Sequence, residues 1–242
     1  VTSMQGQLVT AVKSLVGVAV KTAQNVTAYS FSDSASGVTD ILSKSLSDQT
    51  KYMIDKLTYQ NKQKVAEFDT EITRLEKERD SKKESIQKAS DKKVVALQKK
   101  KDKASNKKAK EKLQKQITAE KESAKKLIKA NETTYKNLIK TQEEYKSAYQ
   151  DASGEFISEF SSAINEYSSQ AQELINSTIN GVAEKYQSQY DALISKQEQL
   201  VSKLKSAGDL FDISGAGVMT ISDLKEQTKQ ITDYTAALAR IR

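Results

Sequence analysis

The 242-residue chain contains no cysteine, histidine, proline or tryptophan. Without cysteine it can form no disulfide bond and offers no thiolate as a nucleophile or a zinc ligand. Without histidine it has neither a Ser-His-Asp triad nor an imidazole acid–base catalyst. Carboxylates are plentiful, but a catalytic carboxyl pair needs a cleft that shifts the pKa of one partner, which a solvated helix face does not provide. We therefore expect no enzyme activity, no metal site and no cofactor.

The lack of proline permits a very long helix, because proline would end or kink one. Residues 48–207 are typical of helix almost throughout, and at about 1.5 Å per residue this run would be on the order of 200 Å long. Hydrophobic residues make up 37% of the chain and charged residues 29%. This balance favours an elongated chain with a narrow apolar seam over a compact globular domain.

Composition divides the chain into three regions. Residues 1–38 are predicted to form an apolar helical segment that ends in a serine-rich turn at 29–38. Residues 39–207 are predicted to form the long coiled-coil helix. Residues 208–242 are predicted to form a glycine-containing turn and a final helix that begins near Ser222.

The beginning of the chain carries its most apolar stretch. Because the first residue is Val1 rather than methionine, we expect the chain to be a piece of a longer or processed protein. The apolar stretch at residues 8–20 is shorter than the ~20 residues that a helix needs to cross a bilayer. We therefore interpret it as a buried helix rather than a membrane segment.

Apolar residues recur along the long helix at helical spacing. They begin in heptad steps at Val65, are interrupted at Arg79 and Lys82, and approach a mean spacing of about 3.7 residues after Phe156. We predict an all-α fold in which this helix forms a parallel coiled-coil bundle, and we expect three chains, although heptad phase alone does not determine the strand number. The predicted bundle-core residues are Val65, Phe68, Ile72, Leu75, Leu113, Ile117, Ile128, Leu138, Phe156, Phe160, Ile164, Tyr167, Ile175, Tyr186, Leu193, Leu200 and Leu204.

The middle of the long helix is strongly basic. From Lys82 to Lys129 there are eighteen lysines and only six acidic residues, and across residues 99–112 the apolar seam is reduced to Ala104 and Ala109. The cohesion of a bundle should be poorest there, because little apolar area is buried and like charges repel. We favour the interpretation that these lysines form a solvated helix face over the interpretation that they bind DNA, since no aromatic residue lies among them to stack on bases. We expect any nucleic-acid contact to be non-specific. An acidic wall, such as the inside of an enclosing tube, is a third interpretation.

Glycines punctuate the later part of the chain. Gly154 and Gly181 would each cost about 1 kcal/mol relative to alanine in a helix, and they indicate either tolerated loosening or a flexible joint. Gly208 is expected to cap the end of the long helix. The residues expected to dock the C-terminal region are Leu210, Phe211, Leu224, Ile231, Tyr234 and Leu238.

Residues 195–242 resemble the late region of tape measure proteins from long, flexible phage tails. In that family a long helical stretch ends in a KLKS-x-GDLF segment, followed by a glycine-containing turn and an L-x-x-Q-x-x-x-I-x-x-Y helix. The matching residues here are Lys203, Leu204, Lys205, Ser206, Gly208, Asp209, Leu210, Phe211, Leu224, Gln227, Ile231 and Tyr234. Elsewhere the resemblance is one of composition, shared with any coiled coil.

The resemblance implies a structural role in the virion. Such proteins fill the tail lumen as three copies, set tail length during assembly, and leave ahead of the DNA at infection. The implied partners are other copies of the chain, the tail tube, the tail-tip or baseplate proteins, and the host membrane on ejection. The implied location is the tail lumen near the tip, and then the host envelope. No catalytic role is carried over.

Two other interpretations remain open from the residues alone. The first is a membrane-active, pore-forming-like helical protein that inserts residues 8–20, for which leakage from liposomes would be the test. The second is a cellular coiled-coil scaffold or nucleic-acid-associated protein, for which steeply salt-dependent DNA binding would be the test.

Overall fold

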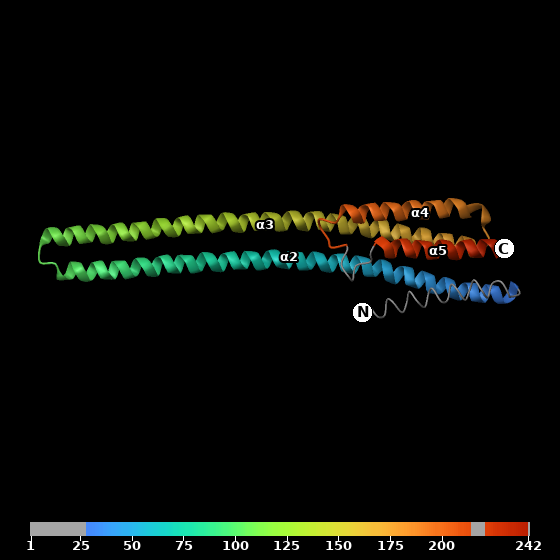
Figure 1. Ribbon diagram of the computed structural model, residues 1–242, viewed down its shortest axis with the longest axis horizontal. Helices are drawn as coiled ribbons and strands as arrows, with labels where there is room; N and C mark the ends of the chain where they lie inside the picture. Colours follow the sequence, from blue (N-terminus) through green and yellow to red (C-terminus); the bar gives the residue numbers. More distant parts are fainter. Residues whose placement is uncertain (1–27, 214–220, 242) are drawn as a thin grey trace. The chain divides into compact units, whose positions relative to one another are not determined.

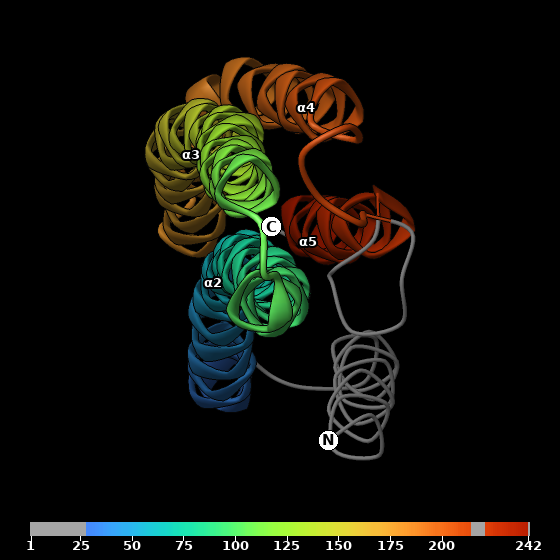
Figure 2. The same ribbon diagram turned by 90° about the vertical axis from the view of Figure 1, so that its left-hand side faces the viewer.

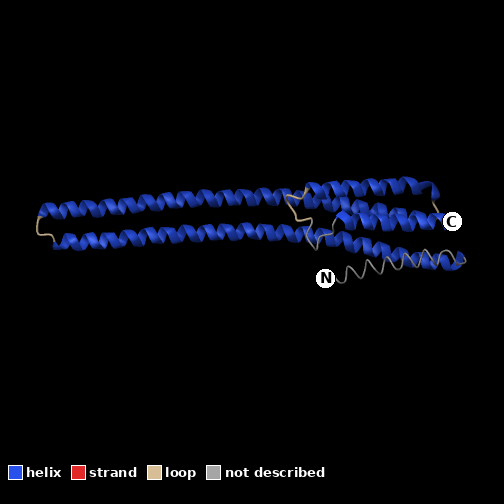
Figure 3. Cartoon of the chain, viewed as in Figure 1, coloured by secondary structure: helices blue, strands red, loops and turns tan. Residues whose placement is uncertain are grey.

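In a computed structural model of the chain, residues 28–213 and 221–241 are described, and these residues form helices joined by short loops (Figure 3). The helices are α2 (Ala28–Lys103), α3 (Lys107–Ile179), α4 (Ala183–Ser206) and α5 (Ile221–Ile241). No strand occurs within those residues, so the prediction of an all-α fold is confirmed. The predicted apolar helix at residues 8–20 lies outside the described residues.

For the isolated chain, the prediction of a single helix over residues 39–207 is wrong, because the chain leaves the helix twice and forms three helices there (Figure 1). The first interruption, at residues 104–106, lies where apolar residues are fewest along the helix. A reversal of the chain there loses little buried apolar area. Asn106 begins α3, since its Oδ1 accepts a hydrogen bond from the Lys108 backbone N–H at 2.8 Å, as an N-cap does.

The second interruption lies at Gly181, which has a φ of 72°. This left-handed conformation suits glycine and ends α3. The backbone N–H of Val182 then donates to the Ser177 carbonyl at 2.9 Å. Gly181 therefore lies in the turn between α3 and α4, whereas Gly154 lies inside α3.

Three other boundaries differ from the predictions. Residues 29–38 are helical, not a turn, because α2 begins at Ala28; serine carries only a modest helix penalty, and the helix continues into the packed residues that follow. At the end of α4, Ala207 is the C-cap, with its N–H directed at the Lys203 and Leu204 carbonyls. The final helix begins at Ile221, one residue before the predicted start.

The described residues belong to two compact units. In the first, Val1–Lys62 with Asp151–Arg242, the early part of α2, the late part of α3, and α4 and α5 all contribute to one apolar core. Figure 2 shows these helices end-on. α4 runs antiparallel to α3: Lys203 forms an ion pair with Glu159 at 2.7 Å, and Lys196 forms one with Glu166. This unit is a four-helix bundle in the sense that its four helical segments share a single core.

The second unit, Gln63–Gln150, is a hairpin of the remaining parts of α2 and α3. The two segments are antiparallel, because paired residues descend along α3 as they ascend along α2 (Figure 1). The contacts that define this register are Asp69–Lys146 (2.6 Å), Glu78–Tyr135 (3.4 Å), Lys83–Glu132 (2.8 Å), Lys93–Glu120 (3.3 Å) and Lys101–Gln114 (2.6 Å). Within one chain the pairing is therefore antiparallel, and the predicted parallel bundle of several copies stays a prediction.

Candidate functional site

The apolar residues of the C-terminal motif lie in the core of the four-helix unit or pack against it. Of the predicted docking residues, Leu210 is half-buried and the other five are buried. Phe211 lies at the end of an aromatic row: its ring centroid is 5.4 Å from that of Phe156, which in turn lies 5.6 Å from that of Phe160. The segment after α4 is thus held by apolar contacts with α3.

The same segment is also held by α2. Gln60 Nε2 donates to the Asp212 carbonyl at 3.1 Å, and the Asp212 backbone N–H donates to Gln60 Oε1 at 3.0 Å. This reciprocal pair satisfies both backbone polar groups of Asp212, the residue that directly follows the GDLF sequence. The loop that follows the motif is therefore held in one position by the side chain amide of Gln60.

Two buried tyrosines connect the last helix to the earlier ones. Tyr167 on α3 lies 2.9 Å from Thr228 on α5, and burial raises the pKa of Tyr167 to about 12. Tyr234 on α5 is hydrogen-bonded to Thr39 on α2, and burial raises the pKa of the Tyr234 hydroxyl above its ordinary value. Both shifts arise because the charged phenolate would lose its hydration in the core.

The predicted bundle-core residues fall into three groups in the structure. Those that are buried are Leu75, Ile117, Phe160, Ile164, Tyr167, Ile175, Leu193, Leu200 and Leu204. Those that are half-buried are Val65, Phe68, Ile72, Leu113, Ile128, Phe156 and Tyr186. Leu138 is 45% exposed, although it lies only three residues after the buried Tyr135, on a neighbouring part of the same helix face. A role for Leu138 at an interface between copies stays a prediction.

The sequence interpretation missed four core residues at the beginning of the described chain. Leu42, Leu46, Met53 and Leu57 on α2 are all buried in the four-helix core. Their spacing of four, seven and four residues is the signal that could have identified them, since it keeps them on one helix face.

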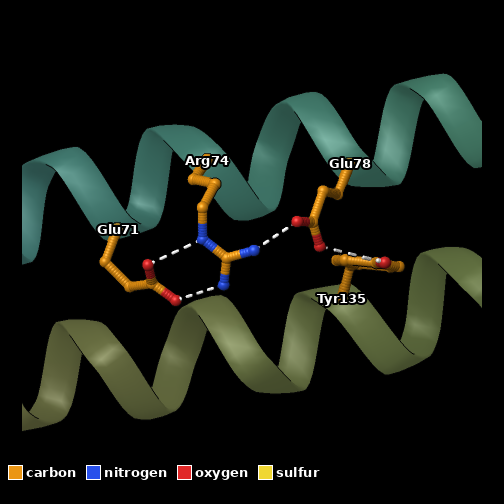
Figure 4. A network of polar contacts seen from close by, with 4 residues as sticks. All are labelled: Glu71, Arg74, Glu78 and Tyr135. Carbon is orange, nitrogen blue, oxygen red and sulfur yellow. Dashed lines mark hydrogen bonds and ion pairs between the residues drawn. The ribbon is translucent and has the colours of Figure 1, made fainter.

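The hairpin has a much thinner core, supplemented by polar contacts. Its buried apolar residues are Leu75, Ile117, Ala124 and Tyr135. Figure 4 shows Arg74 bridging Glu71 and Glu78 along α2, with the Tyr135 hydroxyl of α3 donating to Glu78 at 3.4 Å. The hydrogen bond from Arg74 lowers the pKa of Glu71. The three charged side chains are solvent-exposed, so their ion pairs within α2 add little stability. The contact of the buried Tyr135 with Glu78 is the part of the network that joins the two arms.

A shallow groove between the two arms of the hairpin is lined by side chains of both charge signs. Its lining comprises Glu76, Arg79, Asp80, Lys83, Glu132, Lys136, Ile139, Lys140 and Glu143. Arg79 pairs with Asp80, and Lys83 with Glu132, so much of the charge is compensated within the groove. Across the described residues there is no cluster of three potential metal-ligating side chains. In that same part of the chain, no helix combines the length and apolarity that crossing a membrane requires.

Comparison with known proteins returned no match. No protein-family model, curated protein or solved structure is significantly similar to the chain.

Proposed function

We propose that this chain is a segment of a phage tail tape measure protein, a structural protein that fills the tail lumen and sets tail length. The observation that carries the proposal is the packing of the C-terminal motif. Leu204, Phe211 and Leu224, which carry the family resemblance, are buried together in one core. The resemblance therefore rests on residues that shape the fold of this region and not only on a helix-rich composition.

The long helices support a ruler, because a helix converts residue number into length at a constant rise. α2 and α3 contain 76 and 73 residues. In the tail we propose that the hairpin is open, so that residues 63–150 run as one continuous helix in a parallel bundle of three copies. The two ends of that bundle would meet the tail tube and the tail-tip proteins.

Opening the hairpin has a low local cost. The connection between α2 and α3 is Ala104, Ser105 and Asn106, none of which is a strong helix breaker. The buried apolar contacts that would be lost in the hairpin are few, and copies of the same seam in a parallel bundle would replace them. The same thin seam would let the bundle come apart when the protein leaves the tail ahead of the DNA and meets the host membrane.

The direct test is tail length in the phage that encodes the chain. Deleting residues 85–98 and 116–129 removes two heptads from each arm and leaves the hairpin register intact. If the region is extended in the tail, all 28 deleted residues contribute to its length, and the tail should shorten by about 42 Å. If the hairpin persists, its two arms lie side by side and only the 14 residues of one arm contribute, so the tail should shorten by about 21 Å. An unchanged length would contradict a ruler function, and Leu127→Ala, which alters no length, is the control.

The number of copies is tested separately on the purified chain. Sedimentation gives the mass of the assembled species, and a trimer is expected. A Lys93→Cys variant should then cross-link between chains with a short thiol-reactive reagent, because parallel copies bring the same residue together. A Lys93→Cys/Glu120→Cys variant should cross-link within one chain only when the hairpin is closed, since the two residues pair at 3.3 Å there. A chain that stays monomeric at every concentration would contradict the three-copy arrangement.

A further inference from the structure

Folding back at residues 104–106 brings two lysine-rich segments to one end of the hairpin. Residues 99–115, here called the hairpin end, contain nine lysines and two acidic residues, Asp102 and Glu111. In one continuous helix these lysines would be spread along about 25 Å of rod. In the hairpin they share roughly half that length, on two helices side by side.

The lysines of the hairpin end lack acidic partners within the described chain. Eight of them are exposed and form no ion pair there. Lys101 is half-buried and donates to Gln114 at 2.6 Å, while Asp102 accepts from Gln98 at 2.8 Å. The exposed eight are Lys99, Lys100, Lys103, Lys107, Lys108, Lys110, Lys112 and Lys115.

The remainder of the hairpin, residues 63–98 and 116–150, differs in degree. Seven of its fourteen lysines form an ion pair, three of them across the two arms, as Lys83 does with Glu132 and Lys146 with Asp69. The α3 segment that begins at the hairpin end has no acidic residue in its first turn, although that turn carries the positive end of the helix dipole. The uncompensated positive charge is therefore concentrated at one end of this unit.

We propose that the hairpin end is a docking surface for the phosphate backbone of duplex DNA, and this proposal does not depend on the tail function. Duplex DNA carries one negative charge per about 1.7 Å of its axis, so several phosphates fall within reach of a cluster this small. The only apolar residues of the hairpin end are Ala104, Ala109 and Leu113, too few to insert into a lipid surface. With no aromatic side chain to stack on bases and no base-reading motif, binding is independent of sequence.

The test is binding of the full 242-residue chain to a fluorescent, random-sequence DNA duplex of about three helical turns, followed by anisotropy at rising salt. Between about 50 and 200 mM salt, we expect affinity to fall linearly on a log–log plot with a slope of about −4, as for roughly four to five neutralised phosphates. In the hairpin-end variant Lys99→Gln/Lys103→Gln/Lys108→Gln/Lys112→Gln, affinity should drop at least ~10-fold and the slope should become shallower by about 3. Circular dichroism should show unchanged helix content in that variant.

A matched control removes the same charge elsewhere. Lys44, Lys77, Lys136 and Lys225 are exposed and form no ion pair among the described residues. Changing these four to Gln should alter DNA affinity by less than about 2-fold, apart from the general effect of net charge. Equal losses in the two variants would overturn the proposal, because net charge alone would then explain binding. Binding to phosphatidylserine vesicles or polyglutamate without binding to DNA would overturn it as well.

Discussion

The Tyr167 hydroxyl on α3 donates a hydrogen bond to Thr228 Oγ1 on α5, with 2.9 Å between the oxygens. The direction follows from a second contact: Thr228 Oγ1 lies 2.9 Å from the Leu224 carbonyl, which can only accept, so the threonine proton is used there. Tyr167 is fully buried and Thr228 is 1% exposed. The bond therefore fixes the position of the last helix against α3 inside the core.

Removing this bond from either side should destabilise the four-helix unit unequally. Tyr167→Phe should lower the free energy of unfolding by about 1 kcal/mol, whereas Thr228→Val, which leaves a buried tyrosine hydroxyl without an acceptor, should lower it by about 1–3 kcal/mol. Urea unfolding followed by circular dichroism measures both. Tyr145→Phe, at a 59% exposed residue, is the control. Strict additivity in the Tyr167/Thr228 double variant would contradict a direct bond.

Stability should fall at high pH because of the same tyrosine. Burial raises the pKa of Tyr167 to about 12, above the ordinary value of about 10 expected in the unfolded chain. The neutral form is thus favoured in the folded state, and its contribution is complete below pH ~10 and is lost as the pH rises towards ~12. Over this pH window, the free energy of unfolding should fall less in Tyr167→Phe than in the unchanged chain. The two decreases should differ by on the order of 2 kcal/mol. Parallel pH profiles of the two proteins would contradict the assignment.

Gly154 and Gly181 should respond to alanine in opposite directions. Gly181 has a φ of 72°, so Gly181→Ala forces a left-handed alanine and should lower the free energy of unfolding by about 1–2 kcal/mol. Gly154 is helical, and no neighbouring atom lies within 4 Å of the place that an alanine Cβ would take, so Gly154→Ala should raise it by up to about 1 kcal/mol. Thermal unfolding of the two variants measures both, and a stabilising Gly181→Ala would show that this turn does not need its observed conformation.

Replacing a core leucine with alanine should lower the free energy of unfolding far more than replacing a surface leucine. Leu224 is fully buried between α5 and the rest of the four-helix unit, and Leu224→Ala should cost about 2–5 kcal/mol of unfolding free energy. Leu127, at 56% exposed, should tolerate the same change within about 0.5 kcal/mol in the monomer. A large loss at Leu127 that grows with protein concentration would instead identify it as a contact between copies.

Much of the local structure was predictable from particular residues. The recurrence of apolar residues along α3 and α4 identified Phe160, Ile164, Leu193 and Leu200 as core, because helical periodicity places such residues on one face whatever that face meets. The absence of proline correctly indicated long helices. The same periodicity carries no information about which face meets which, so the fold-back of α3 on α2 was not predictable.

What the sequence by itself determined is the all-helical character of the described residues, the position of the final helix and the lysine density of residues 99–115, since each depends on local propensity or simple count. The tertiary structure alone decided that residues 104–106 form a reversal rather than part of a rod. Asn106 caps α3 there, and apolar residues of α2 and α3 cover one another once the chain turns back. That choice depends on long-range packing between residues far apart in the chain, and it converts a rod with lysines spread along it into a hairpin with its lysines gathered at one end.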